Sequence, residues 1–235
     1  MTQRSMLAGR NPNVVIRAGG DVRVEGRDSD RVLADTDSRW GLKVERRSES
    51  EIARARARVG DHVLFDMRLN VRNPLKKGPR GEVTEVQIGG SGKVYVPLGS
   101  DVTVYTGKNA EVQDIQGSVT VYAGLDARVR GVRTLVQVSA GGSLDFECEQ
   151  VAGDDVKFTA GRDLRCSIRS LTDAEFMIDD LGGYWEGIIG QGRTKIRLEA
   201  GGDVTLVTDQ EITSRPPYDV LGKVERPNAA SDVSG

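Results

Sequence analysis

The sequence predicts an all-β protein folded as a β-solenoid, a single-stranded parallel β-helix of about ten coils with about 20 residues each. Three observations favour this fold. A short phrase around a glycine recurs along the chain, its copies lie about 20 residues apart, and the residues on both sides of it alternate between apolar and polar. A β-sandwich, which also uses many short strands joined by turns, is the alternative.

The recurring phrase consists of a small or apolar residue, Gly, any residue, Asp or Ser, and then apolar, polar and apolar residues. We expect its glycine to permit a sharp corner with positive φ, and the Asp or Ser to bind backbone N–H groups that the corner leaves free. The corner residues selected by this pattern are Gly19, Asp21, Gly99, Asp101, Gly124, Asp126, Gly141, Ser143, Gly161, Asp163, Gly201 and Asp203. The sequence around Gly182 also fits this phrase, except that Tyr184 stands at the Asp-or-Ser position.

Each unit is expected to hold one short strand before the corner and one after it, as in 14–18 and 22–24. Such a unit cannot bury its apolar face alone, so equivalent strands should pair in parallel about 4.8 Å apart. One inward ladder would hold Val24, Phe65, Val104, Val129, Phe146, Cys166 and Leu206, and its neighbour Val22, Val63, Val102, Ala127, Leu144, Leu164 and Val204. The alternating segment 48–58 predicts another strand, and the Gly-rich phrase 89–93 a flexible connection.

The composition excludes several kinds of site. The 33 basic and 35 acidic side chains give a net charge of −2, and the single histidine, His62, cannot complete a zinc site or a histidine-based triad. Cys148 and Cys166 lie about one coil apart, but Cys166 aligns with Phe146, so both should be free thiols. We expect no metal, no cofactor and no enzymatic activity.

We expect three regions: a polar N-terminal segment (1–13), the β-solenoid domain (14–209) and a Pro-containing flexible tail (210–235). No apolar run is long enough to span a bilayer, and the first 13 residues lack the apolar core of a signal peptide. The expected location is therefore the cytoplasm.

Two groups of side chains are candidates for an interaction surface. Tyr95, Tyr105 and Tyr122 alternate out of phase with the inward valines, which predicts an outward tyrosine strip. Arg54, Arg56 and Arg58 could place guanidinium groups on one face, although neighbouring glutamates and the net charge of −2 argue against nucleic acid as the partner.

The phrases that begin at Arg17, Thr159 and Glu199 resemble the short repeats of filamentous-haemagglutinin-type adhesins. The span 14–209 is similar to the adhesin-like β-solenoid domains of bacteria, and bactofilins, scaffolds that polymerise end to end, are a second resemblance. These resemblances imply a solenoid whose motifs serve corner geometry.

The predicted function is a non-enzymatic structural or protein-interaction scaffold that binds itself or another protein. Self-association should occur through the first coil, near Val14, because Ser214 to Pro217 would block strand pairing at the other end. The alternatives are an adhesin-like module that reaches the cell surface by another route, and a carbohydrate-active β-helix enzyme.

Overall fold

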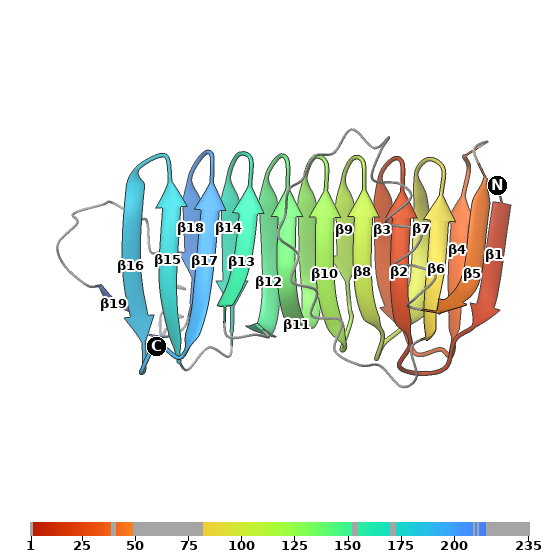
Figure 1. Cartoon of the computed structure of the whole chain (residues 1–235), viewed down its shortest axis with the longest axis horizontal. Helices are drawn as coiled ribbons and strands as arrows, with labels where there is room; N and C mark the ends of the chain where they lie inside the picture. The colour runs from red at the N-terminus through yellow and green to blue at the C-terminus, as the bar shows by residue number, and fades with distance from the viewer. Residues whose placement is uncertain are drawn as a thin grey trace, which may run out of the picture.

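The computed structural model describes residues 2–38, 41–48, 82–151, 155–169, 173–208, 210 and 212–214. These residues form no helix and 19 strands, which confirms the predicted all-β class (Figure 1). The strands are β1 (Thr2–Leu7), β2 (Asn13–Ala18), β3 (Val22–Arg27), β4 (Arg31–Thr36), β5 (Leu42–Ser48), β6 (Glu82–Ile88), β7 (Gly92–Pro97), β8 (Asp101–Thr106), β9 (Ala110–Gln113), β10 (Ser118–Ala123), β11 (Ala127–Ala140), β12 (Leu144–Val151), β13 (Asp155–Ala160), β14 (Leu164–Ile168), β15 (Ala174–Asp180), β16 (Gly183–Ile189), β17 (Thr194–Ala200), β18 (Val204–Val207) and β19 (Thr213–Ser214).

The strands lie in two layers on either side of the core (Figure 1). In the first layer, parallel pairing connects β6, β2, β8, β10, the second half of β11, β13, β17 and β15 in that order. In the second layer it connects β7, β3, β9, the first part of β11, β12, β14 and β18. Every other side chain points inward, and Ile16, Phe146 and Phe158 are among those fully buried.

Seven glycines at the corners between the layers stand in one column. Their spatial order is Gly89, Gly19, Gly107, Gly124, Gly141, Gly161 and Gly201. A Cβ atom on Gly19 would lie 2.8 Å from the Gly89 carbonyl oxygen, and one on Gly107 would lie 2.7 Å from that of Gly19. The other four approaches are closer still, so a side chain at any of the six corners from Gly19 to Gly201 would collide with the backbone of the neighbouring unit.

The expected reason for these glycines is wrong. None of the seven has a positive φ; the described glycines that do are Gly9, Gly41, Gly131, Gly183, Gly190 and Gly192. The corner glycines are therefore required by close backbone approach and not by left-handed conformation.

The phase of one predicted unit is also wrong. Val102 and Val104 pair with Val14 and Ile16 in the first layer, not with Val22 and Val24. Gly99 and Asp101 consequently lie at the opposite corner of the unit, and the true corner of this unit is Gly107.

The inward ladder through Val24 continues instead through Val94 and Val112, and then through Val129 and Phe146 as predicted.

The phrase 89–93 is the corner between β6 and β7 and not a flexible connection. Phe65, Val63 and the predicted strand from 48 to 58, apart from Ser48 at the end of β5, lie outside the described residues.

Units are not stacked in chain order. The unit 13–27 lies between 82–97 and 101–113, so the expectation that Val14 begins an open end of the stack is wrong. Gly182 is likewise not a corner of the stack, because β15 and β16 form an antiparallel hairpin around it.

Antiparallel strands close the end of the stack beside β6 and β7. β5 pairs with β6, β4 with β7, and β1 with β4. The Arg46 guanidinium of β5 donates a hydrogen bond to the Leu7 carbonyl of β1 at 2.8 Å. β1 lies within the predicted N-terminal polar segment, and these contacts tie it to the stack.

Cys148 and Cys166 are buried, unpaired thiols, and Cys166 lies opposite Phe146 as predicted. Burial raises the pKa of the Cys148 thiol to about 12 and also raises that of Cys166. Both therefore act as small core side chains. The described residues contain no helix long and apolar enough to cross a membrane.

The glycine column makes a direct prediction about stability. Replacing Gly161 with Ala should lower the free energy of unfolding by about 1–3 kcal/mol, because the new methyl group meets the fixed Gly141 carbonyl. Gly90→Ala is the matched control, since its nearest obstacle is the Ser38 side chain and not the backbone of a neighbouring unit. Urea unfolding of both variants measures the difference, and equal losses would contradict the column as the cause.

Candidate functional site

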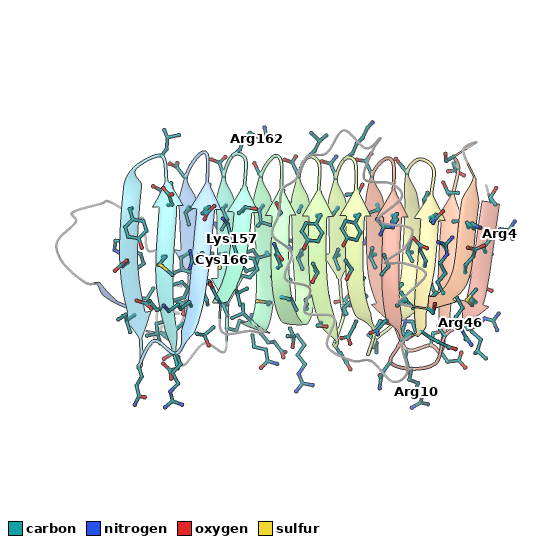
Figure 2. All side chains as sticks on the ribbon, in the orientation of Figure 1. Arg4, Arg10, Arg46, Lys157, Arg162 and Cys166 are labelled. Carbon is teal, nitrogen blue, oxygen red and sulfur yellow. The ribbon has the colours of Figure 1, made fainter. Side chains whose placement is uncertain are left out.

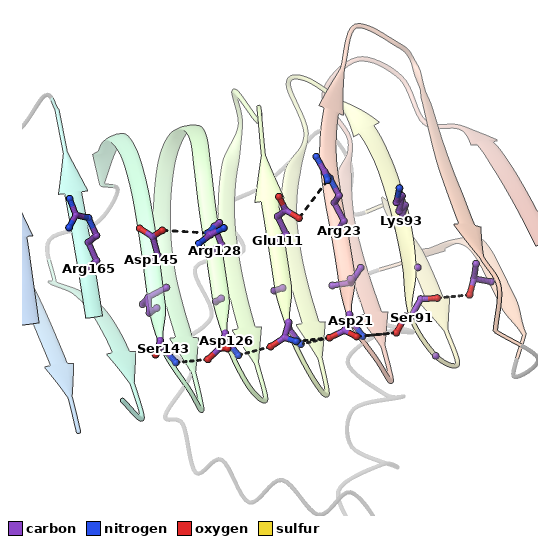
Figure 3. Close-up of a pocket in the computed structure, with 18 of the residues that line it drawn as sticks. Asp21, Arg23, Ser91, Lys93, Glu111, Asp126, Arg128, Ser143, Asp145 and Arg165 are labelled. Atoms are coloured by element: carbon purple, nitrogen blue, oxygen red, sulfur yellow. Dashed lines mark hydrogen bonds and ion pairs between the residues drawn. The ribbon is translucent and has the colours of Figure 1, made fainter. Parts of the chain in front are cut away.

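A groove of about 1780 Å³ runs along the outer face of the second layer (Figure 3). Its lining residues come from β3, β4, β7, β9, β11, β12, β14 and β18 and from the corners that precede them. Since these strands are paired in register, equivalent residues form rows that cross the strands. Two rows are prominent: a corner row of hydrogen-bond acceptors and a charged row two residues further along each strand.

The corner row consists of the side chains at the Asp or Ser position of each unit. In spatial order they are Ser91, Asp21, Asn109, Asp126, Ser143, Asp163 and Asp203. Most bind the backbone N–H of the equivalent residue in the next unit, as Figure 3 shows. Asp21 Oδ1 accepts from Asn109 N at 3.2 Å, and Asp126 Oδ1 accepts from Ser143 N at 2.8 Å. The row therefore links each unit to its neighbour.

These bonds also set the protonation of the corner carboxyls. The Asn109 N–H holds the pKa of Asp21 below its ordinary value of 3.8. For Asp126, the Ser143 N–H and then the Arg162 guanidinium have the same effect. Arg162 projects from the corner edge of the molecule (Figure 2), and its Nη2 lies 2.8 Å from Asp126 Oδ1. Both carboxyls are anionic near neutral pH.

The charged row alternates in sign along most of its length. In spatial order it contains Asp35, Lys93, Arg23, Glu111, Arg128, Asp145, Arg165 and Thr205. Neighbours form ion pairs: Arg128 Nε lies 3.4 Å from Asp145 Oδ2, and Arg23 Nη1 lies 3.7 Å from Glu111 Oε2. Both pairs are well exposed, so each contributes little to stability.

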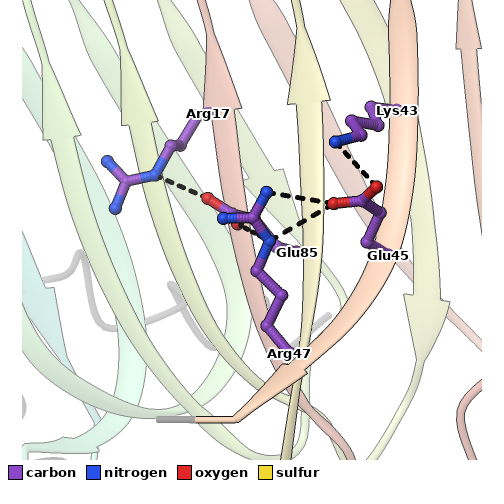
Figure 4. A network of polar contacts seen from close by, with 5 residues as sticks. All are labelled: Arg17, Lys43, Glu45, Arg47 and Glu85. Atoms are coloured by element: carbon purple, nitrogen blue, oxygen red, sulfur yellow. Dashed lines mark hydrogen bonds and ion pairs between the residues drawn. The ribbon is translucent and has the colours of Figure 1, made fainter. Parts of the chain in front are cut away.

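The outer face of the first layer carries a separate polar network around the buried Glu85 (Figure 4). Arg17 Nε and Arg47 Nε lie 3.0 and 3.1 Å from its two carboxylate oxygens, and Arg47 also binds Glu45. Lys43 Nζ approaches Glu45 at 2.7 Å. This network joins the antiparallel β5 to β6 and β2, and is therefore a structural element of the closed end.

The three tyrosines do not form one strip. Tyr105 and Tyr122 stack in the first layer with ring centroids 5.1 Å apart, and Arg17 lies over Tyr105. Tyr95 lies in the second layer beneath the Arg27 guanidinium, at the rim of the groove. Tyr105 and Tyr122 alternate with the inward Val104 and Val121 as predicted. Because Tyr95 lies in the other layer and Tyr122 is only 7% exposed, the three do not form one exposed strip.

Two further groups of predicted residues remain, the corner residues Gly99 and Asp101 and the three arginines. Asp101 binds Ser118 N at 2.8 Å at the corner opposite the glycine column, beside Gly99. Arg54, Arg56 and Arg58 lie outside the described residues. Among the residues that the structure describes, no group of three or more His, Cys, Asp or Glu side chains could hold a metal ion.

The sequence pattern marks Arg23, Arg128, Asp145, Arg165 and Thr205 as outward polar positions, but it missed Asp35, Lys93 and Glu111 of the charged row and the corner residues Ser91 and Asn109. Ser91 satisfies the phrase, but its glycine-rich surroundings resembled a flexible connection. Asn109 falls outside an Asp-or-Ser rule, although its amide oxygen accepts Asp126 N at 3.0 Å just as a carboxylate would. A rule that allowed Asn would have found this corner and the correct phase.

No family model matches this chain, and no curated protein matches it. A solved structure described as a "putative cell adhesion protein" from Clostridium sporogenes is similar, with a TM-score of 0.37 and 7% sequence identity. The similarity covers 88% of this chain and 99% of that one. Likeness at this level establishes neither a common fold nor a common function.

The corner row predicts a loss of stability in acid. The lowered pKa values of Asp21 and Asp126 mean that their anionic forms stabilise the fold above pH 3.8, and this contribution is lost as the pH falls through the lower folded values. Asp126→Asn should therefore melt at a lower temperature than the unmodified protein at pH 7, with a smaller gap near pH 2. Thermal melts across this range test it, and a gap that does not change with pH would contradict it.

Proposed function

We propose that this protein is a two-sided β-solenoid that serves as a non-enzymatic binding scaffold, with the groove of the second layer as its binding face. The observation that carries the proposal is the continuous register of the second layer. Six parallel pairings in succession hold outward side chains in straight rows at about 4.8 Å intervals. A surface of this kind is ordered before any partner arrives, which lowers the entropic cost of binding.

The repeated unit supports the solenoid. Each unit passes from a first-layer strand through a glycine corner to a second-layer strand, and then returns to the first layer. In chain order, the corner glycines from Gly89 to Gly161 follow one another at intervals of 17 to 20 residues. Parallel pairing in register between successive units is the arrangement expected of stacked coils.

The state of the acidic side chains supports binding over catalysis. A general acid near neutral pH needs a raised pKa, whereas Asp21 and Asp126 have lowered ones. Asp145 is held by Arg128 and Arg130, and Glu111 by Arg23. These groups are therefore suited to fixed hydrogen bonding and charge contacts.

The end of the stack that β1, β4 and β5 close is unsuited to pairing with another chain, which favours binding through the outer faces of the two layers. β5 carries Lys43, Glu45 and Arg47 on its outer face, and charges on an edge strand oppose pairing with another chain. β1 is connected to β5 through Arg46. We propose that the chain does not polymerise through this end.

This proposal predicts a monomer at high micromolar concentration in analytical ultracentrifugation. A variant that lacks residues 2–7 would expose the backbone edge of β4 that now pairs with β1, and should associate as concentration rises. The double variant Lys157→Gln/Arg197→Gln, on the first-layer face, should stay monomeric. Filaments of the unmodified protein would contradict the proposal and favour the bactofilin-like alternative.

Cross-linking in the native cell tests the binding face. A photoreactive residue at position 128 in the groove should give covalent adducts with a partner, whereas the same residue at position 197, on the first-layer face, should not. Adducts at both positions or at neither would contradict the groove as the binding face. Adducts only at position 197 would indicate that the outer face of the first layer, and not the groove, binds the partner.

A further inference from the structure

The groove has a longer repeat than the single coil. Three strands carry the sequence Asp, apolar, Arg: Asp21 and Arg23 on β3, Asp126 and Arg128 on β11, and Asp163 and Arg165 on β14. The strands between them have a neutral corner residue followed by an acid: Asn109 and Glu111 on β9, and Ser143 and Asp145 on β12. The outer face therefore repeats every two coils, although the fold requires a repeat of only one.

This repeat fixes the distance between like groups. Because neighbouring strands are about 4.8 Å apart, the three arginines recur about every 9.6 Å and span about 19 Å in total. An acid on the intervening strand lies between each pair of arginines. A ligand along this row must satisfy donors and acceptors in alternation.

The row also contains polar atoms with no partner. Asp35 is 9% exposed, and its buried Oδ1 accepts no hydrogen bond. Arg23 Nε is buried and likewise donates none. Both side chains line the groove, on either side of Lys93 in the same row. Unsatisfied buried groups are costly, so an unpaired acceptor and an unpaired donor at one end of the groove indicate a place where a ligand binds.

The alternation restricts the chemistry of the ligand. A polyanion would meet Glu111 and Asp145 between the arginines, and a polycation would meet the arginines. An extended polypeptide has a two-residue repeat of about 6.6–6.8 Å, which falls out of step with a 9.6 Å row. A hydroxyl group both donates and accepts, so a chain rich in hydroxyls can satisfy guanidinium and carboxylate groups side by side.

We propose that the groove binds a linear polysaccharide that lies along the stack axis, with successive sugar hydroxyls bound by the charged row and the corner row. Asp35 and Lys93 hold one end of the bound chain, and Arg165 lies near the other. This inference rests on the proposed binding-scaffold function and specifies its ligand.

The existing ion pairs do not prevent this binding. The side chains of Arg128 and Arg23 are 58% and 42% exposed, and exposed pairs contribute little. A sugar hydroxyl can bridge an arginine and its acidic partner without separating them. The corner carboxylates use mainly one oxygen to bind the neighbouring unit, as Asp126 Oδ1 does.

The test is calorimetric titration with length series of cello-, chito- and galacturonate oligosaccharides, and with a proline-rich and an alternating Lys/Glu peptide. Affinity for at least one oligosaccharide series should rise with length and level off near the span of about 29 Å from Asp35 to Arg165, which is six strand spacings of about 4.8 Å. The triple variant Arg23→Gln/Arg128→Gln/Arg165→Gln should bind at least about tenfold more weakly. The matched control Lys157→Gln/Lys195→Gln/Arg197→Gln, which removes three paired cations from the first-layer face, should bind like the unmodified protein.

Asp35→Asn provides a separate check that does not depend on folding. Because the Asp35 Oδ1 atom has no partner, the variant should melt no lower than the unmodified protein while binding the oligosaccharide several-fold more weakly. Binding of no oligosaccharide, binding of a peptide instead, or equal binding by the two triple variants would overturn the inference. If groove-specific cross-links to a protein form while no sugar binds, the scaffold function stands and the polysaccharide is wrong.

Discussion

The close approach of backbones at the glycine column is the constraint on which the rest of the structure depends. Each corner glycine donates its N–H to the unit beneath, as Gly124 does to the Thr106 carbonyl at 3.0 Å. This contact sets the separation of neighbouring units at the corner, and the strands on both sides of the corner then pair in register. The rows of inward apolar and outward polar side chains follow from that register, because side chains alternate along a strand.

The stacking of the units departs from chain order beside β13. β17 lies between β13 and β15, although β15 precedes it in the sequence. Direct pairing of β13 with β15 in the same register would place Asp155 opposite Glu175, whereas the observed order places Lys195 between them. Opposite charges across strands are favourable, so Lys195 stabilises this contact. The same order places Arg197 opposite Lys157 and Glu199 opposite Asp179, so outward charge alone does not select it.

The candidate site depends on the same register between neighbouring units. The Asp, Asn and Ser side chains of the corner row link neighbouring units, and this holds the charged row straight along the groove. The ion pairs of the row do not account for the unpartnered Asp35 Oδ1 and Arg23 Nε atoms. On the first-layer face, Lys157, Lys195 and Arg197 all have acidic partners. The buried Glu85 Oε2 of that face, which has no hydrogen bond, lies 3.1 Å from Arg47 Nε.

The sequence by itself determined the all-β class, the two-strand unit with its glycine corner and the inward ladder from Val129 to Leu206, because these depend on local alternation and on one repeated phrase. It could not determine the phase of the unit around Gly99, because the false corner from Leu98 to Val104 fits the phrase completely, whereas the true corner carries Asn109 where the phrase has Asp or Ser. Only the tertiary structure decided the order of the units, the antiparallel closure by β1, β4 and β5, and the groove. These depend on which strands meet across long stretches of chain, as when Arg23 and Glu111 come together from 88 positions apart, and no local pattern carries that information.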